Sequence, residues 1–246
     1  MDTNLIRLAI DGIKEAVCEF RFESHSVPEI VIGRLTDAAA WAGFFQTRLP
    51  TADLPEQLRA AEESLRFAPT YQLNDPANQS NFLRVGANVI SCHTLAPYPG
   101  WDAFRPRIAE ALAALSDALP NVKLLRIGFR FVNAFSEATH GISSGIDLNI
   151  SIAAGGTEVG RDFVILYSKE LSSTHGVQIT IATPKFVNGP EGRNIDMLID
   201  IDVSTPDGGT VPEVGNALSW VDIAHDGLKE EFFRLIPADV VDRLRG

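Results

Sequence analysis

Two stretches of this sequence alternate as strictly as a half-buried β-strand does, and each contains the word Phe-Arg-Phe. Residues 15–23 read EAVCEFRFE, and residues 124–132 read LLRIGFRFV. Apolar side chains at every second position form one face of such a strand, and charged side chains form the other. The phenylalanines therefore mark a core face and the arginines an opposite face. The chain is expected to fold around a sheet that is covered on one side only.

The patterns that follow these two strands are also similar. A helical stripe at Trp101, Phe104, Ile108, Leu112 and Leu115 recurs with the same spacing at residues 221, 224, 228, 232 and 235. The sequence predicts an α+β fold, an antiparallel curved sheet with long packing helices. One interpretation is two related β-α-β(n)-α halves, residues 1–120 and 121–246, within one continuous structural unit. The alternative is that the two amphipathic helices have the same spacing by chance. Both interpretations, duplication and chance, stay open.

Apolar spacing and Gly/Pro breaks predict the remaining elements. A hairpin is expected around Gly86–Asn88, and a loop over residues 136–145. Helices are expected at 28–49, at 54–66, from 101 to Pro120, from near Pro212, and after Pro237. Further strands are expected near 70–75 and at 146–153, 160–169, 176–186 and 194–204.

Composition argues against several classes of protein. The net charge is −11, from 32 acidic and 21 basic residues, which disfavours binding to a phosphate backbone. No basic leader and no run of about 18 apolar residues occurs, so we expect a soluble, cytoplasmic protein with no membrane span. The two cysteines, Cys18 and Cys92, have no CxxC partner and are interpreted as reduced, buried residues.

Short motifs supply no strong catalytic signal. Residues 141–145, GISSG, match G-x-S-x-G, but a strand rather than a helix is expected to follow, so we interpret the glycines as loop residues. No phosphate-binding loop and no HExxH motif is present, and we expect no cofactor and no metal. Asp196, Asp200 and Asp202 share the wet face of a predicted strand.

Two groups of residues are candidate sites. Arg21 and Arg130 occupy equivalent places in the two opening strands, and Arg84 and Arg126 also point away from predicted apolar faces. Together they could form a basic strip that binds an anionic ligand or an acidic partner; the alternative is cross-strand pairing with glutamates such as Glu19.

The second candidate site lies on the last long helix. Asp222, His225 and Asp226 share roughly one face of it. We prefer to interpret these three as a solvated helix surface in which a histidine neighbours an aspartate.

Several short sequence segments resemble those of a bacterial family known as "sporadically distributed" proteins of unassigned function. They are EAVCEFRF at 15–22, PYPGW at 97–101, RIGFRFVN at 126–133, WVDIAH at 220–225 and FFRLIP at 232–237. The family more often has tyrosine at the place of Phe131, so this chain lacks a phenol there. The resemblance implies an accessory or defence-type gene product, and it implies no activity and no catalytic residues.

These observations lead to two functional hypotheses. The first is a non-enzymatic binding protein that docks a partner protein or an anionic ligand. The second is a helix-grip-like small-molecule-binding protein or enzyme, with a pocket between the sheet and the C-terminal helix at 213–236.

Overall fold

A nine-stranded antiparallel sheet forms the centre of the fold. The computed structural model describes residues 6–159, 162–186 and 195–245. The order of the strands is β2-β3-β4-β5-β1-β6-β11-β10-β9. Their bounds are β1 Ile13–Glu23, β2 Phe45–Arg48, β3 Tyr71–Asn74, β4 Asn81–Val85, β5 Val89–Leu95, β6 Lys123–Phe135, β9 Val164–Ser172, β10 His175–Ala182 and β11 Met197–Ser204. A separate hairpin consists of β7 Ala153–Ala154 and β8 Thr157–Glu158.

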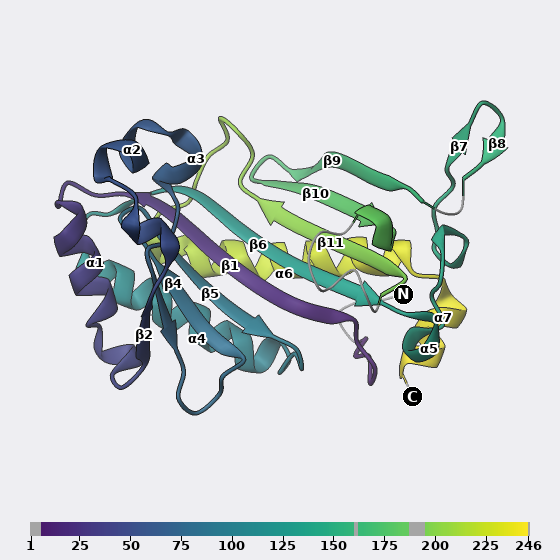
Figure 1. Cartoon of the computed structure of the whole chain (residues 1–246), viewed down its shortest axis with the longest axis horizontal. Helices are drawn as coiled ribbons and strands as arrows, with labels where there is room; N and C mark the ends of the chain where they lie inside the picture. The colour runs from purple at the N-terminus through teal and green to yellow at the C-terminus, as the bar shows by residue number, and fades with distance from the viewer. Residues whose placement is uncertain (1–5, 160–161, 187–194, 246) are drawn as a thin grey trace.

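Two long helices cover one face of this sheet (Figure 1). Helix α4 packs on β5, α6 packs on β6 and β11, and the two helices contact each other. The helices are α1 Pro28–Thr36, α2 Glu56–Ala61, α3 Glu63–Arg66, α4 Trp101–Ala118, α5 Glu137–His140, α6 Val214–Leu235 and α7 Ala238–Arg245. The α+β class expected from the sequence is confirmed.

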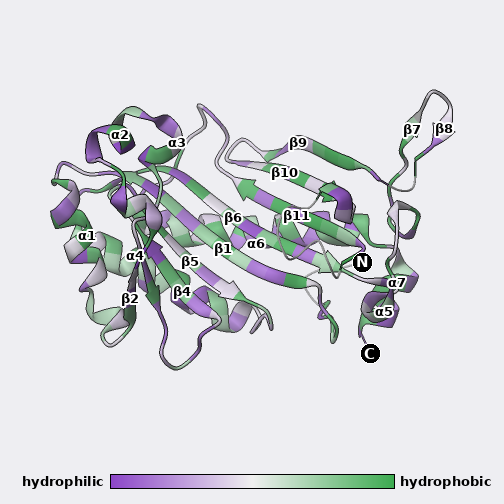
Figure 2. Ribbon diagram, in the orientation of Figure 1, coloured by the Kyte–Doolittle hydropathy of each residue, from purple (hydrophilic) through white to green (hydrophobic). Residues whose placement is uncertain are grey.

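The two Phe-Arg-Phe strands lie side by side at the middle of the sheet. In β1 and β6 the phenylalanines Phe20, Phe22, Phe129 and Phe131 are buried against the helices. Figure 2 shows hydrophobic and hydrophilic residues alternating along these strands. Glu19 lies opposite Gly128, and these two residues are 109 positions apart, as are the two words. One sheet therefore runs through both halves; their origin as copies stays a prediction.

The helix predicted at 28–49 is wrong in its second part. Helix α1 ends at Thr36, and Phe45–Arg48 forms edge strand β2, which pairs with β3. The indole of Trp41 donates a 2.7 Å hydrogen bond to the Leu35 carbonyl, so the chain folds back on the end of α1. Phe45, expected in the buried stripe, is 67% exposed. The apolar stripe continues in the sequence beyond Thr36, but among the described residues no other element covers Phe45.

Two other predicted elements are corrected. The helix predicted at 54–66 is interrupted by the extended backbone of Glu62, and its stripe residue Leu58 is exposed. The strand predicted at 146–153 is replaced by a 3-10 turn at Gly145–Asp147 and a loop. There the Asp147 carboxylate accepts hydrogen bonds from the backbone of Ser143 and Ser144, which caps the turn.

The other expected elements are present with shifted ends. The hairpin β4–β5, helix α4 and the two C-terminal helices confirm the prediction. The strands expected at 160–169, 176–186 and 194–204 correspond to β9, β10 and β11. Residues 160, 161 and 194 of those ranges lie outside the described residues.

Candidate functional site

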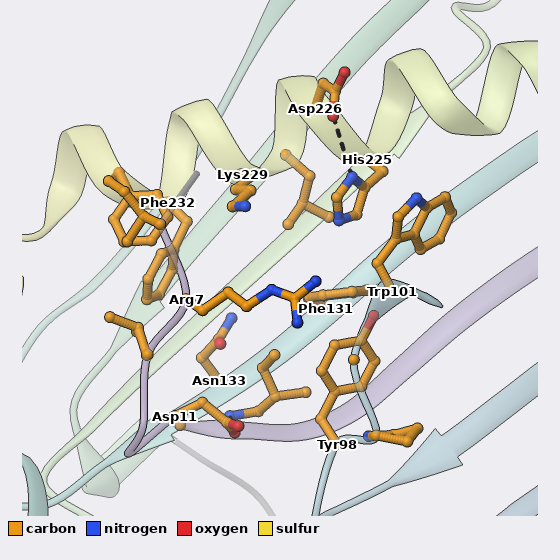
Figure 3. Close-up of a pocket in the computed structure, with 18 of the residues that line it drawn as sticks. Arg7, Asp11, Tyr98, Trp101, Phe131, Asn133, His225, Asp226, Lys229 and Phe232 are labelled. Atoms are coloured by element: carbon orange, nitrogen blue, oxygen red, sulfur yellow. Dashed lines mark hydrogen bonds and ion pairs between the residues drawn. The ribbon is translucent and has the colours of Figure 1, made fainter. Parts of the chain in front are cut away.

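A pocket of about 450 Å³ opens between α6 and the sheet, on the helix-covered side. We call it the α6 pocket. Its walls come from four parts of the chain: the segment 6–13 before and into β1, the segment 98–102 at the start of α4, two side chains of β6, and the face of α6 from His225 to Phe233. Figure 3 shows these side chains converging from opposite sides of the cavity.

Local sequence explains how the wall at 98–102 is built. Gly100 has φ +90°, a conformation that favours glycine, and it lets the chain turn sharply into α4. Trp101 thereby becomes the first residue of the helix. Its indole packs edge-on to Phe129 of β6, with ring centres 5.6 Å apart. The turn therefore fixes an aromatic wall against the central strands.

His225 lies in the wall that α6 provides. Its ring stacks on Trp101 at 4.2 Å and 9°, and its side chain is 13% exposed. Nδ1 lies 3.2 Å from Oδ1 of Asp226, and the other ring nitrogen points toward the pocket interior (Figure 3). Burial lowers the pKa of His225, and this outweighs the opposing effect of Asp226. The imidazole is therefore neutral at pH 7.

Tyr98, Phe131 and Asn133 line the side opposite α6. Tyr98 packs edge-on to Phe131, with ring centres 5.2 Å apart. Its hydroxyl is buried and has no hydrogen-bond partner within the described chain, and burial raises the pKa of this phenol. The Asn133 amide, which is also buried, donates to the carbonyl of Ile199 at 3.2 Å. This wall is apolar with two polar groups set into it.

Charged side chains lie around the pocket in nearly balanced numbers. Arg7 and Asp102 form a 2.7 Å ion pair in which both side chains are exposed. In Figure 3 the Arg7 side chain extends across the pocket toward Tyr98 and Trp101. Lys229 and Asp226 line the α6 side, and Asp11 lies at the start of β1. Burial raises the pKa of Asp11, which also accepts a hydrogen bond from the Ile13 backbone.

The structure separates the three helix residues that the sequence grouped together. His225 and Asp226 line the α6 pocket. Asp222 instead accepts two hydrogen bonds, at 2.6 and 2.8 Å, from Arg105 of α4. The preferred interpretation as a solvated surface does not fit His225, whose ring packs between Trp101 and the sheet.

The four arginines of the expected basic strip do lie on one face of the sheet, the face opposite the helices. Arg21 is hydrogen-bonded within its own strand, and the other three are hydrogen-bonded to neighbouring strands. Arg21 bonds to Glu19, Arg84 to Gln72, Arg126 to Glu19 and Asp202, and Arg130 to both carboxylate oxygens of Asp200. Carboxylates of the sheet therefore already neutralise part of the positive charge that would attract an anion there.

A hydrogen-bonded chain on the same open face escaped the sequence analysis. Ser91 Oγ lies 2.8 Å from His93 Nε2, and His93 Nδ1 lies 2.8 Å from Oε1 of Glu15. Ser91 and His93 are buried, and Phe82 stacks on the histidine ring at 4.6 Å. The alternation of β5 indicates that Ser91 and His93 share a face, but only strand pairing brings Glu15 to them. Ser91 does not line the α6 pocket.

The sequence also does not predict most of the α6 pocket as a site, although several of the segments that line it are distinctive in sequence. Three segments quoted in the sequence analysis meet there: PYPGW through Tyr98 and Trp101, RIGFRFVN through Phe131 and Asn133, and WVDIAH through His225. The segment 6–12 gave no signal. Among the described residues, no group of three His, Cys, Asp or Glu side chains is placed to hold a metal ion.

Comparison with known families finds no family model that matches this chain, and comparison with curated proteins finds no matching relative. Within the described part of the chain, no helix is both long and apolar enough to cross a membrane.

Proposed function

We propose that this protein binds a small planar organic molecule in the α6 pocket. The observation that carries the proposal is the pocket itself, about 450 Å³ between the sheet and α6. Small-molecule sites commonly have volumes of roughly 300–1,000 Å³, mostly apolar walls and a few convergent polar groups. The α6 pocket has all three features, and it lies between the sheet and the C-terminal helix, where the second hypothesis from the sequence expects a pocket.

The chemistry of the walls favours an aromatic or heteroaromatic ligand that carries little charge. The rings of Tyr98, Trp101 and Phe131 supply flat surfaces on which a ring can stack or pack edge-on. Arg7 and Lys229 are offset by three aspartates, so the lining has no surplus of positive charge. A neutral His225 offers a ring nitrogen that accepts a hydrogen bond from an N–H or O–H group of the ligand.

Docking of a protein partner or an anion on the open face is supported less well. The arginines expected to make that contact are engaged by carboxylates or by Gln72 of the same sheet. That hypothesis stays a prediction, and charge reversal at Arg21 and Arg130 tests it by the loss of partner capture.

A fragment screen tests the proposed pocket. Planar aromatic fragments are titrated by calorimetry, and we expect binders that also raise the melting temperature. A ligand at 100 times its Kd stabilises the folded state by about 2.7 kcal/mol. In the variant Leu8→Trp, a larger side chain from the segment that lines the pocket should abolish binding.

Leu166→Trp is the matched control. Leu166 lies on edge strand β9 and is 62% exposed, so the same substitution there leaves the pocket unchanged. Fragments that bound wild type and Leu8→Trp equally well would overturn the proposed site.

A further inference from the structure

We propose that His225 acts as a proton acceptor in the α6 pocket, so that the protein is an acid–base catalyst acting on a planar organic substrate. This inference rests on the proposed function, because it needs a ligand in the pocket. It goes further, because a binding protein requires no base.

The geometry of His225 is that of an oriented base. Two contacts hold the ring: one face stacks on Trp101 with ring centres 4.2 Å apart, and Nδ1 lies 3.2 Å from Oδ1 of Asp226. Since a carboxylate only accepts, Nδ1 carries the proton, and Nε2 keeps its lone pair. Nε2 is the nitrogen directed into the pocket (Figure 3).

The surroundings keep the ring neutral and therefore able to take a proton. Burial is the largest influence on its pKa and lowers it; Lys229 acts in the same direction, whereas Asp226 and Asp222 oppose it. Other charged or titratable groups around the pocket are Arg7, Asp11, Tyr98 and Asp102. General bases of this kind contribute about 10²–10⁴-fold in rate.

The substrate class follows from the walls. A flat molecule that packs against the aromatic side chains of the pocket can turn an edge toward Nε2, so the acidic hydrogen should lie on or next to an aromatic or conjugated ring. In the chemical step Nε2 takes that proton, and the bonding electron pair stays on the substrate, where the ring system delocalises it or a leaving group departs with it. No oxidant, reductant or second substrate is needed.

A base of this type is testable with a probe of known chemistry, 5-nitrobenzisoxazole, which is planar and uncharged. Removal of its C3 proton by Nε2 turns the C–H electron pair into the second π bond of a nitrile. The N–O bond breaks, and a coloured phenolate forms. We expect saturable turnover by the wild-type protein that exceeds the rate with free imidazole at the same concentration, and a fall of about 100-fold in kcat/KM for His225→Ala.

Three further variants separate a base from a packing residue. His225→Gln keeps the size of the side chain and should lose turnover like His225→Ala. His25→Ala removes an exposed histidine and should leave turnover unchanged. Asp226→Asn tests a positioning residue: because Asp226 raises the pKa of His225, its loss should move the midpoint of the pH–rate profile, already below 6.5, to lower pH.

Binding and turnover are read separately. Quenching of the tryptophan fluorescence by the nitro probe reports binding, whether or not a reaction follows, because one of the three tryptophans, Trp101, lines the pocket. Quenching without turnover, or turnover that His225→Ala does not reduce, overturns the base and leaves the proposed binding function standing. Absence of both overturns the base as well, and the fragment screen then decides the binding function independently.

Discussion

The buried hydroxyl of Tyr98 makes a prediction that runs against the usual effect of mutation. Tyr98→Phe removes one oxygen atom and changes little else, because the edge-on contacts of the ring with Phe104 and Phe131 need only the ring. In the folded protein the hydroxyl is shielded and has no hydrogen-bond partner among the described residues. In the unfolded chain water solvates it. The substitution should therefore stabilise the protein.

The size of the effect follows from the cost of an unsatisfied buried polar group, which is about 1–3 kcal/mol. At the lower limit, a gain of about 1 kcal/mol in the free energy of unfolding raises the melting temperature of a domain of 150–250 residues by about 2–4 °C. Urea denaturation and calorimetry of the ligand-free protein measure both quantities. Tyr167→Phe on edge strand β9 is the control, since this tyrosine is 37% exposed and should show no change.

A Tyr98→Phe variant that was less stable than wild type would refute this reasoning. It would mean that the hydroxyl has a hydrogen-bond partner in solution, such as an enclosed water molecule. A ligand that raised the melting temperature of wild type more than that of Tyr98→Phe would instead identify the hydroxyl as a ligand contact.

Three other predictions concern reactivity, pH dependence and the mouth of the pocket. Burial raises the pKa of Cys18 and of Cys92, the latter to about 12, so iodoacetamide should label neither thiol until denaturant is added; rapid labelling of the native protein, read by mass spectrometry, would contradict this. The hydrogen bond from His93 lowers the pKa of Glu15 from 4.5, so this carboxylate stabilises the fold above that pH and its contribution is lost as the pH falls through the lowered value. Glu15→Gln should thus cost about 1 kcal/mol in urea denaturation at pH 7 and progressively less as the pH falls below 4.5, whereas a cost that did not change with pH would refute the link. Arg7→Ala breaks an exposed ion pair worth at most about 1 kcal/mol, so stability should hardly change while fragments enter and leave the pocket faster in stopped-flow measurements.

The parts of the fold that local patterns predicted are those in which one periodicity covers a whole element. The alternation of apolar and polar residues around Phe20 and Phe129 predicts both central strands and their buried faces. The apolar stripe from Trp101 to Leu115 predicts α4. The helix predicted through Phe45 is wrong, because apolar periodicity predicts which side chains a segment could bury and not whether another element packs against them. Helix α1 ends at Thr36, and the Trp41 indole folds back to donate a hydrogen bond to the Leu35 carbonyl.

Local sequence patterns are enough to predict an α+β chain, a sheet covered on one side and the buried faces of its central strands. That Tyr98, Asn133 and His225 share one cavity follows from the three-dimensional fold, because these residues lie on three segments that strand order and helix packing bring together. The three-dimensional fold also decides that the arginines between the phenylalanines bond within their own sheet. Local patterns depend on neighbours along the chain, whereas a site depends on neighbours in space.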